Sequence, residues 1–143
     1  MRRIIYLVLI TLCIQFPSIV SADQTLDQLE AREVIARYFD ALKQGDTQTI
    51  QSLLDGDLLT ARKSLLNNPN YPDHLIVTYK DMAYEITALE TLDDGVLKVD
   101  TTIAMNDQEA RKTQYLLHRA ERENTTSKQL YIFAEIDATL EEY

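Results

Sequence analysis

The sequence is poor in the residues that disulfide-stabilised domains, thiol enzymes and zinc proteins depend on. Its 143 residues include one cysteine, two histidines, three glycines, three prolines and no tryptophan. Cys13 lies in an apolar N-terminal stretch, so the rest of the chain has no disulfide, no thiol nucleophile and no cysteine ligand for a metal. The sequence also lacks a glycine-rich phosphate loop, a nucleophile elbow and an HExxH helix. The protein classes that these motifs define are therefore excluded.

The two histidines, His74 and His118, fall on separate predicted elements, which disfavours a zinc site. His118 as a general base requires an orienting carboxylate, and Glu135 or Asp137 on the following strand is a candidate to supply it. The sequence therefore predicts no metal and no cofactor.

Positive charge is scarce in this chain. There are 14 basic and 23 acidic residues, and without Arg2 and Arg3 the balance is 12 against 23, a net charge of −11. A body this acidic disfavours binding to nucleic acid and to anionic membrane surfaces. We interpret the charge as a solubility feature, and the basic stretches Arg111-Lys112 and Arg119–Glu123 as solvated strand edges and a turn.

The N-terminal 22 residues have the pattern of a secretory signal peptide. Met1-Arg2-Arg3 is basic, residues 4–16 are almost wholly apolar, and Val20-Ser21-Ala22 provides small or compatible residues before a cleavage point. Because the apolar run is shorter than the roughly 20 residues that span a bilayer, we expect cleavage after Ala22 rather than a permanent anchor. The expected product is a periplasmic or secreted protein with a single domain, residues 23–143.

The strongest pattern in the chain is an amphipathic helix within Thr25–Asp46. Thr25 and Gln28 fit a capping box at its start, Gly45 fits the left-handed residue that ends a helix, and Asp46 fits the cap of a second helix. The apolar residues recur at spacings of three and four, which predicts one buried stripe: Ala31, Val34, Ile35, Tyr38, Phe39 and Leu42.

Further helical patterns follow over Thr47–Asp55 and Leu58–Leu66, with a break at Gly56. Residues 67–72 contain two prolines and three asparagines and are predicted to form a loop. His74–Met82 fits either a strand or a short helix with Pro72 near its start, and we predict the helix.

From Ala83 onward the hydrophobic period becomes two. Asp93-Asp94-Gly95 is typical of a hairpin turn, and short polar turns separate the later strands, so the pattern indicates an antiparallel meander. Helices followed by strands predict an α+β domain, with N-terminal helices packed on one face of a curved four-stranded antiparallel sheet. The predicted strands begin at Ala83, Leu97, Arg111 and Gln129, and the last three run to Met105, Glu121 and Thr139.

The last predicted strand carries large side chains on both faces. Its alternation places Leu130, Ile132, Ala134 and Ile136 opposite Tyr131, Phe133, Glu135 and Asp137. One face should cover the helices, and the other should expose either Tyr131 and Phe133 or Leu130 and Ile132. An exposed face of this kind is typical of a partner surface, and we expect a homodimer through the outer face of the sheet.

The stretch Arg37–Asp46, RYFDALKQGD, followed by Ile50 and Leu53-Leu54, resembles the first helix and turn of the NTF2-like (cystatin-like α+β) superfamily. The order of helices and then a four-strand meander is similar through Thr139, so the resemblance covers nearly all of residues 23–143. It implies a conical fold in which a bent sheet wraps the long helix and leaves a pocket at the open end. The superfamily includes ketosteroid-isomerase-like enzymes, dehydratases, small-ligand binders and exported domains, so the resemblance supports fold more than function.

Tyr38 falls where an isomerase-like enzyme places its oxyanion-donating tyrosine, and a buried phenol there stabilises a dienolate. In an ungapped comparison, however, Arg62 takes the position of the carboxylate base, while Asp55 and Asp57 lie in the helix break. Because Tyr38 also belongs to the apolar stripe, a core tyrosine with its hydroxyl at a polar rim is the simpler interpretation.

The leading hypothesis is an exported, non-catalytic NTF2-like domain that binds a small molecule in its cone or a protein partner through its sheet. The alternatives are a small isomerase or dehydratase using Tyr38 with a histidine or aspartate in the pocket, and a structural accessory subunit. No catalytic residue is assigned. The candidate ligand-binding residues are Tyr38, Tyr84, Tyr115, His118 and Phe133.

Overall fold

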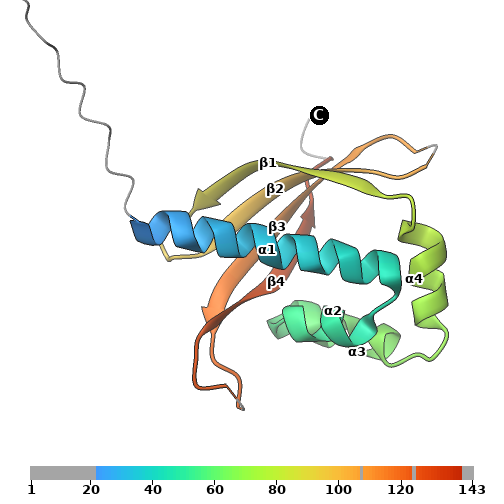
Figure 1. The fold of residues 1–143 in the computed structure, drawn as a ribbon, viewed down its shortest axis with the longest axis horizontal. Helices are drawn as coiled ribbons and strands as arrows, with labels where there is room; N and C mark the ends of the chain where they lie inside the picture. The colour runs from blue at the N-terminus through green and yellow to red at the C-terminus, as the bar shows by residue number, and fades with distance from the viewer. Residues whose placement is uncertain (1–21, 107, 124, 140–143) are drawn as a thin grey trace, which may run out of the picture.

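A computed structural model of the chain describes residues 22–106, 108–123 and 125–139. The strands form an antiparallel sheet in the order β1-β2-β3-β4, and α1 lies across one face of this sheet (Figure 1). This arrangement confirms the predicted α+β class with N-terminal helices on a four-stranded antiparallel sheet. The elements are α1 (Ala22–Gln44), α2 (Thr47–Leu53), α3 (Gly56–Leu66), α4 (Tyr71–Tyr79), β1 (Ala83–Thr91), β2 (Leu97–Ala104), β3 (Arg111–Ala120) and β4 (Gln129–Asp137).

The predicted signal peptide lies outside the described residues except for Ala22, where α1 begins. The prediction that a capping box at Thr25 and Gln28 starts this helix is wrong, because both residues lie inside α1. No glycine or proline separates Ala22 from Thr25, so nothing in the backbone stops the helix from extending there. Within the part of the chain that the structure describes, no helix is long and apolar enough to cross a membrane.

The turn between α1 and α2 follows the prediction. Gly45 has a positive φ of 66°, and the Asp46 amide donates back to the Ala41 carbonyl at 2.9 Å. Asp46 then caps α2, since its carboxylate accepts hydrogen bonds from the Thr49 amide at 3.0 Å and the Thr49 hydroxyl at 2.6 Å. The first of these bonds satisfies one of the amide groups that the first turn of a helix leaves without partners.

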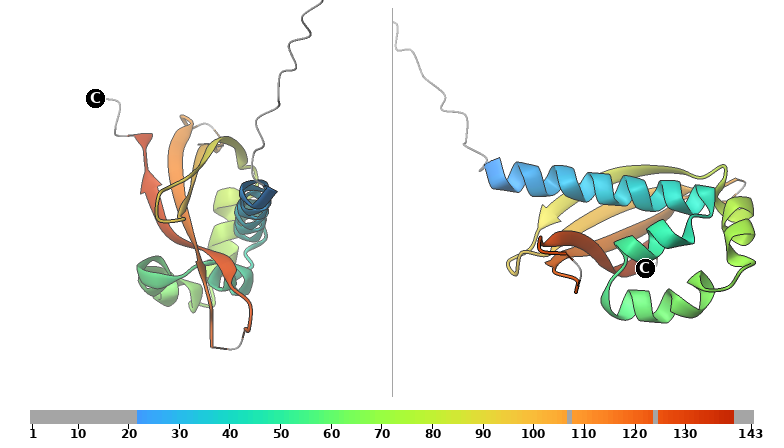
Figure 2. Two further views of the ribbon diagram at one scale, coloured as in Figure 1. Left: turned by 90° about the vertical axis from the view of Figure 1, so that its left-hand side faces the viewer. Right: turned by 60° about the horizontal axis from the view of Figure 1, so that its bottom comes forward.

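Helix α2 ends at Leu53, earlier than the predicted Asp55, because the chain becomes extended and meets the edge of β4. Leu54 forms an isolated parallel bridge with Ile132, and the Asp55 amide donates to the Ile132 carbonyl at 2.9 Å. Helix α3 then begins at Gly56 itself. The views in Figure 2 show α1 on one side of the sheet, with α2 and α3 passing the β4 edge. The helix predicted over His74–Met82 is confirmed as α4, which begins at Tyr71.

The core lies between the apolar stripe of α1 and the inner face of the sheet. Phe39 is fully buried, and its ring lies 4.2 Å from the Tyr84 ring and 5.7 Å from the Tyr115 ring, between centroids. On β2 the alternation is regular, since Leu97, Val99, Thr101 and Ile103 are all buried. Burial of each such large apolar side chain contributes about 1.5–3 kcal/mol, so this layer fixes the position of α1 on the sheet.

A β-bulge in β4 changes which side chains face the helices. Leu117 pairs with Ile132, but the neighbouring Leu116 pairs with Ala134, so Phe133 is an extra residue on β4. An added residue reverses the alternation beyond it. The predicted alternation is therefore wrong after Ile132, and Glu135, which pairs with the buried Tyr115, faces inward.

The outer face is less exposed than expected. Tyr131 is 3% exposed, and the Arg122 guanidinium lies 4.3 Å from the centre of its ring. Phe133 is half-buried, with its ring 4.7 Å from that of His118. The expectation that this face exposes Tyr131 is wrong, since a cation covers the ring.

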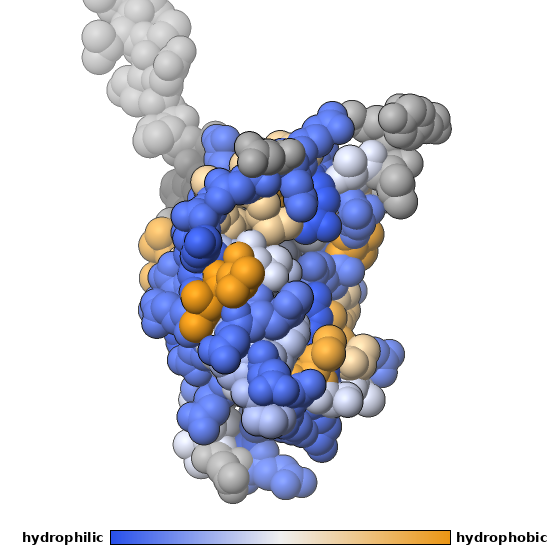
Figure 3. All heavy atoms as spheres, turned by 90° about the vertical axis from the view of Figure 1, so that its right-hand side faces the viewer, coloured by the Kyte–Doolittle hydropathy of each residue, from blue (hydrophilic) through white to orange (hydrophobic). Residues whose placement is uncertain are grey.

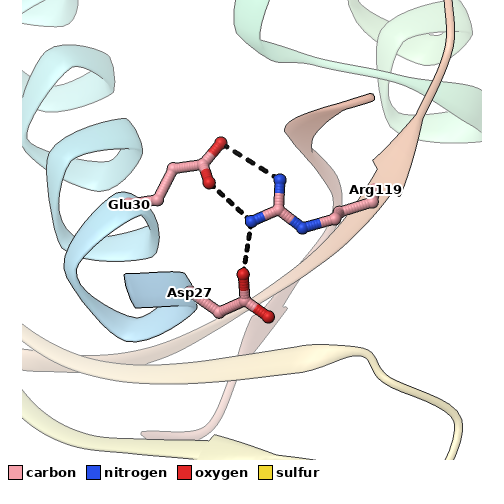
Figure 4. A network of polar contacts seen from close by, with 3 residues as sticks. All are labelled: Asp27, Glu30 and Arg119. Carbon is pink, nitrogen blue, oxygen red and sulfur yellow. Dashed lines mark hydrogen bonds and ion pairs between the residues drawn. The ribbon is translucent and has the colours of Figure 1, made fainter. Parts of the chain in front are cut away.

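Arg119 and Arg122, which we expected to be solvated, instead connect the sheet to α1 and to the segment that follows α2. Arg122 donates from Nη2 to the Leu54 carbonyl. Arg119 on β3 pairs with Glu30 of α1 at 2.5 Å and also with Asp27 (Figure 4). All three side chains of the Arg119 cluster are about a third or more exposed, so the cluster contributes little stability and chiefly orients the first turns of α1.

Candidate functional site

A cavity of about 220 Å³ lies between the second half of α1, helices α3 and α4, and the inner face of the sheet. Apolar side chains such as Phe39, Leu42 and Ile103 form part of its wall. Polar side chains converge on the same space from five elements: Tyr38 of α1, Arg62 of α3, Tyr79 of α4, Tyr115 of β3 and Glu135 of β4. The lining thus has more polar and charged side chains than apolar ones, and it offers a small molecule several hydrogen-bonding groups that could fix its orientation.

Tyr38, Arg62 and Glu135 form one hydrogen-bonded cluster in this cavity. The Arg62 guanidinium donates from Nη1 to the Tyr38 hydroxyl and from Nη2 to Glu135 Oε2 at 2.5 Å. The Tyr38 hydroxyl in turn donates to Glu135 Oε2 at 3.4 Å. The side chains of Arg62 and Glu135 are each 28% exposed, so the ion pair lies at the mouth of the cavity and the phenol lies deeper.

Burial decides the protonation of the cavity's tyrosines. Burial first, and then the nearby charge of Glu135, raise the pKa of Tyr38 well above its usual value. The same two causes raise the pKa of Tyr115 and Tyr79. Burial works to lower the pKa of Arg62, but Tyr38 and Glu135 outweigh it and the pKa is raised. All three phenols therefore keep their protons, and Arg62 keeps its charge, throughout the physiological pH range.

Tyr115 differs from Tyr38 in its hydrogen bonding. Its side chain is 1% exposed and its ring packs edge-on against Tyr38 and Phe39. Among the described residues, however, its hydroxyl has no hydrogen-bond partner, although it borders the cavity. Asp100 Oδ1 is the one fully buried side-chain polar atom without a partner among the described residues, so the Tyr115 hydroxyl is open to the cavity and available to donate to a molecule there.

The structure brings some of the predicted site residues together and separates others. Tyr38 and Tyr115 line the cavity. Tyr84 packs on Phe39 but is not part of the lining. His118 and Phe133 lie on the opposite face of the sheet, packed against one another, so neither reaches the cavity.

His118 does have a carboxylate partner, but not either of those expected. Its Nε2 lies 2.8 Å from Asp55 Oδ2. The bulge in β4 turns Glu135 and Asp137 to the inner face, so the expectation that one of them orients His118 is wrong. The contact joins the start of α3 to β3 across β4 and so holds in place the helix that carries Arg62.

Asp55 is expected to stabilise the fold in a pH-dependent manner. Burial works to raise its pKa, but the hydrogen bonds from His118 and from the Gly56 amide outweigh it and hold the pKa below its usual value. A carboxyl with a lowered folded-state pKa stabilises the protein above its unfolded-state pKa, and loses that contribution as pH falls through the folded-state value. We expect Asp55→Asn to lower the free energy of unfolding by about 1 kcal/mol at pH 6 and to have little effect near pH 2.

Urea denaturation from pH 6 to pH 2 measures this difference. Asp57→Asn is the matched control, because it removes an exposed carboxylate from the first turn of the same helix. A loss that stays constant down to pH 2, or an equal loss in the Asp57 variant at pH 6, contradicts the assigned role of the His118–Asp55 contact.

Arg62 and Glu135 are the cavity residues that sequence reasoning placed least well. The ungapped comparison did point to the position of Arg62, but a guanidinium there lowered the expectation of a site. The alternation of β4 assigned Glu135 to the face of Phe133, and only the bulge places it beside Tyr115. No signal in the local sequence of β4 predicts that one of its residues is left without a partner on β3.

No group of three or more metal-ligating side chains occurs among the described residues. No protein-family model, no curated protein and no solved structure matches this chain. Its function is therefore inferred from the cavity and its side chains.

Proposed function

We propose that this chain is an exported, non-catalytic domain of the NTF2-like type that binds a small molecule in the cavity between α1, α3, α4 and the sheet. The observation that carries the proposal is the hydroxyl of the buried residue Tyr115, which opens into the cavity and has no hydrogen-bond partner among the described residues. A bound molecule with a hydrogen-bond acceptor supplies the missing partner. The basic, apolar and small-residue pattern of residues 1–22 supports export.

The hydrogen bonds of the cluster favour binding over catalysis. Oε2 of Glu135 accepts from Arg62 at 2.5 Å and from Tyr38 at 3.4 Å, so only Oε1 of this carboxylate is left to take a proton from a substrate. The Tyr38 hydroxyl, which an isomerase needs as a free donor, is already engaged with both partners. The side chains thus form a rigid polar wall.

The first test is native mass spectrometry of the protein purified after expression of the full chain. We expect a mass beginning at Asp23, together with an added mass that is lost on denaturation. Tyr115→Phe should lower the fraction of bound protein, and Tyr71→Phe, a tyrosine of α4 outside the lining, should not. A protein that carries no added mass and binds none of the probes described below contradicts the proposal.

A catalytic alternative has one observation in its favour. Tyr38 and Glu135 bring a phenol and a carboxylate within 3.4 Å of each other in one cavity, which supplies the carboxylate that isomerase chemistry needs from β4 instead of α3. Glu135 would then remove a proton next to a carbonyl while Tyr38 stabilises the oxyanion. Exchange of the α-hydrogens of cyclohexanone for deuterium, followed by NMR in D₂O, tests this: exchange that wild type accelerates and Glu135→Gln abolishes would favour the enzyme.

A further inference from the structure

The charged side chains around the cavity balance one another. Arg62 and Arg111 provide two cations, and Glu135 and Asp137 provide two anions. A charged ligand loses its hydration on entering and meets as many like charges as opposite ones, so burial of its charge is not compensated. This balance disfavours both carboxylates and amines as ligands.

The cavity has both donors and acceptors that remain available for hydrogen bonds to a ligand. The Tyr115 and Tyr79 hydroxyls border it without hydrogen-bond partners among the described residues, and because burial raises their pKa both remain donors. Glu135 uses Oε2 for both Arg62 and Tyr38, so Oε1 remains as an acceptor. A ligand that satisfies both kinds needs an acceptor and a donor close together.

The size of the cavity limits the ligand further. A volume of about 220 Å³ equals that of roughly seven waters at about 30 Å³ each. It is also below the roughly 300–1,000 Å³ of sites for drug-sized molecules. The cavity therefore suits a ligand of about seven non-hydrogen atoms.

We infer that the cavity selects a small uncharged amide or lactam, whose carbonyl accepts from the Tyr115 hydroxyl and whose N–H donates to Glu135. This inference rests on the proposed function, since it names the class of ligand for the same cavity. Tyr115 and Glu135 are directly paired across β3 and β4, so they present a donor and an acceptor side by side. A lactam ring places its carbonyl and N–H on one edge in the same way.

Four probes of matched size test the inference: 2-piperidinone, cyclohexanone, pentanoate and cyclohexylammonium, each with about seven non-hydrogen atoms. They carry, in that order, a donor and an acceptor, an acceptor alone, a negative charge and a positive charge; pentanoate is an open chain and the other three are six-membered rings. Each is titrated into the ¹⁵N-labelled protein, purified after expression of the full chain, and amide shifts of Thr113, Tyr115 and Glu135 are followed by NMR. We expect 2-piperidinone to bind about tenfold more tightly than cyclohexanone, the effect of one hydrogen bond, and the two ions to bind more weakly still.

Three variants, of which Tyr71→Phe is a control, make the test specific. Tyr115→Phe should weaken 2-piperidinone about tenfold, while Tyr71→Phe should leave its affinity unchanged. Glu135→Gln removes one of the two anions, so it should strengthen the binding of pentanoate relative to wild type. The comparison of probes on wild type remains decisive if a variant does not fold.

Each outcome has a defined meaning. Pentanoate or cyclohexylammonium binding as tightly as 2-piperidinone overturns the charge argument, and equal binding of cyclohexanone overturns the need for a donor; either result leaves small-molecule binding intact. No shift with any probe up to 50 mM, together with a bare native mass, overturns both the ligand class and the proposed function.

Discussion

Gly45→Ala is expected to lower the free energy of unfolding by about 2–5 kcal/mol. Gly45 has a φ of 66°, and a side chain in this left-handed region costs about 1–2 kcal/mol. A Cβ added there would also lie 2.6 Å from the Pro72 carbonyl oxygen and 3.1 Å from Ile76 Cγ1. Since Pro72 belongs to α4 and its oxygen is part of the backbone, either α4 or the α1–α2 turn must move, which adds about 1–3 kcal/mol.

Gly95→Ala is the matched control for this prediction. Gly95 has a similar positive φ of 80°, but a Cβ there meets no atom within 4 Å. It should therefore show only the conformational cost, about 1–2 kcal/mol. Urea denaturation followed by circular dichroism measures both variants, and equal losses would contradict the close approach of α4 to the α1–α2 turn.

The parts of the fold that the sequence predicts well are those fixed by local spacing. The apolar stripe of α1 places Tyr38 and Phe39 in the core because a helix brings residues three and four apart onto one face. Asp46 caps α2 for an equally local reason. The period of two over β2 is regular because one face of that strand is buried throughout its length.

The parts that the sequence does not predict depend on contacts between distant segments. Phe133 becomes unpaired only because β3 and β4 change register, and that single event moves Glu135 into the cavity. Asp55 meets His118 because the chain after α2 adds to the edge of β4. Both events are set by how strands meet in space, so neither leaves a periodic signal.

The exposed apolar residues bear on whether the molecule has a surface for a protein partner. Figure 3, viewed from the side where α4 lies, shows small hydrophobic patches separated by hydrophilic surface. On α3 and α4 the exposed apolar residues are Leu65, Ile76 and Val77. Scattered apolar residues of this kind are normal on protein surfaces, so a cavity into which the Tyr115 hydroxyl opens is the better guide to function than either this surface or the sheet's outer face.

Phe39→Ala should cause the second large loss, about 3–5 kcal/mol of the free energy of unfolding, which is typical of a buried phenylalanine. The side chain is fully buried, and its ring touches Tyr38, Tyr84 and Tyr115, with centroids 5.8, 4.2 and 5.7 Å away. Three rigid aromatic rings cannot collapse into the space that a lost ring leaves, so most of the cavity cost is retained. For a domain whose total stability is about 5–15 kcal/mol, this is a large share.

The control is Phe133→Ala, which removes the same ring from the half-buried outer face and should cost about 1–2 kcal/mol, in proportion to its smaller buried area. Urea denaturation of both variants gives the comparison. Because Phe39 also forms part of the cavity wall, its removal enlarges the cavity, and 2-piperidinone should bind more weakly to Phe39→Ala than to Phe133→Ala. A Phe39 loss no larger than that of Phe133 would show that the aromatic layer beneath the cavity is loosely packed, and a site that loose cannot hold Tyr115 and Glu135 at the fixed spacing that selective binding requires.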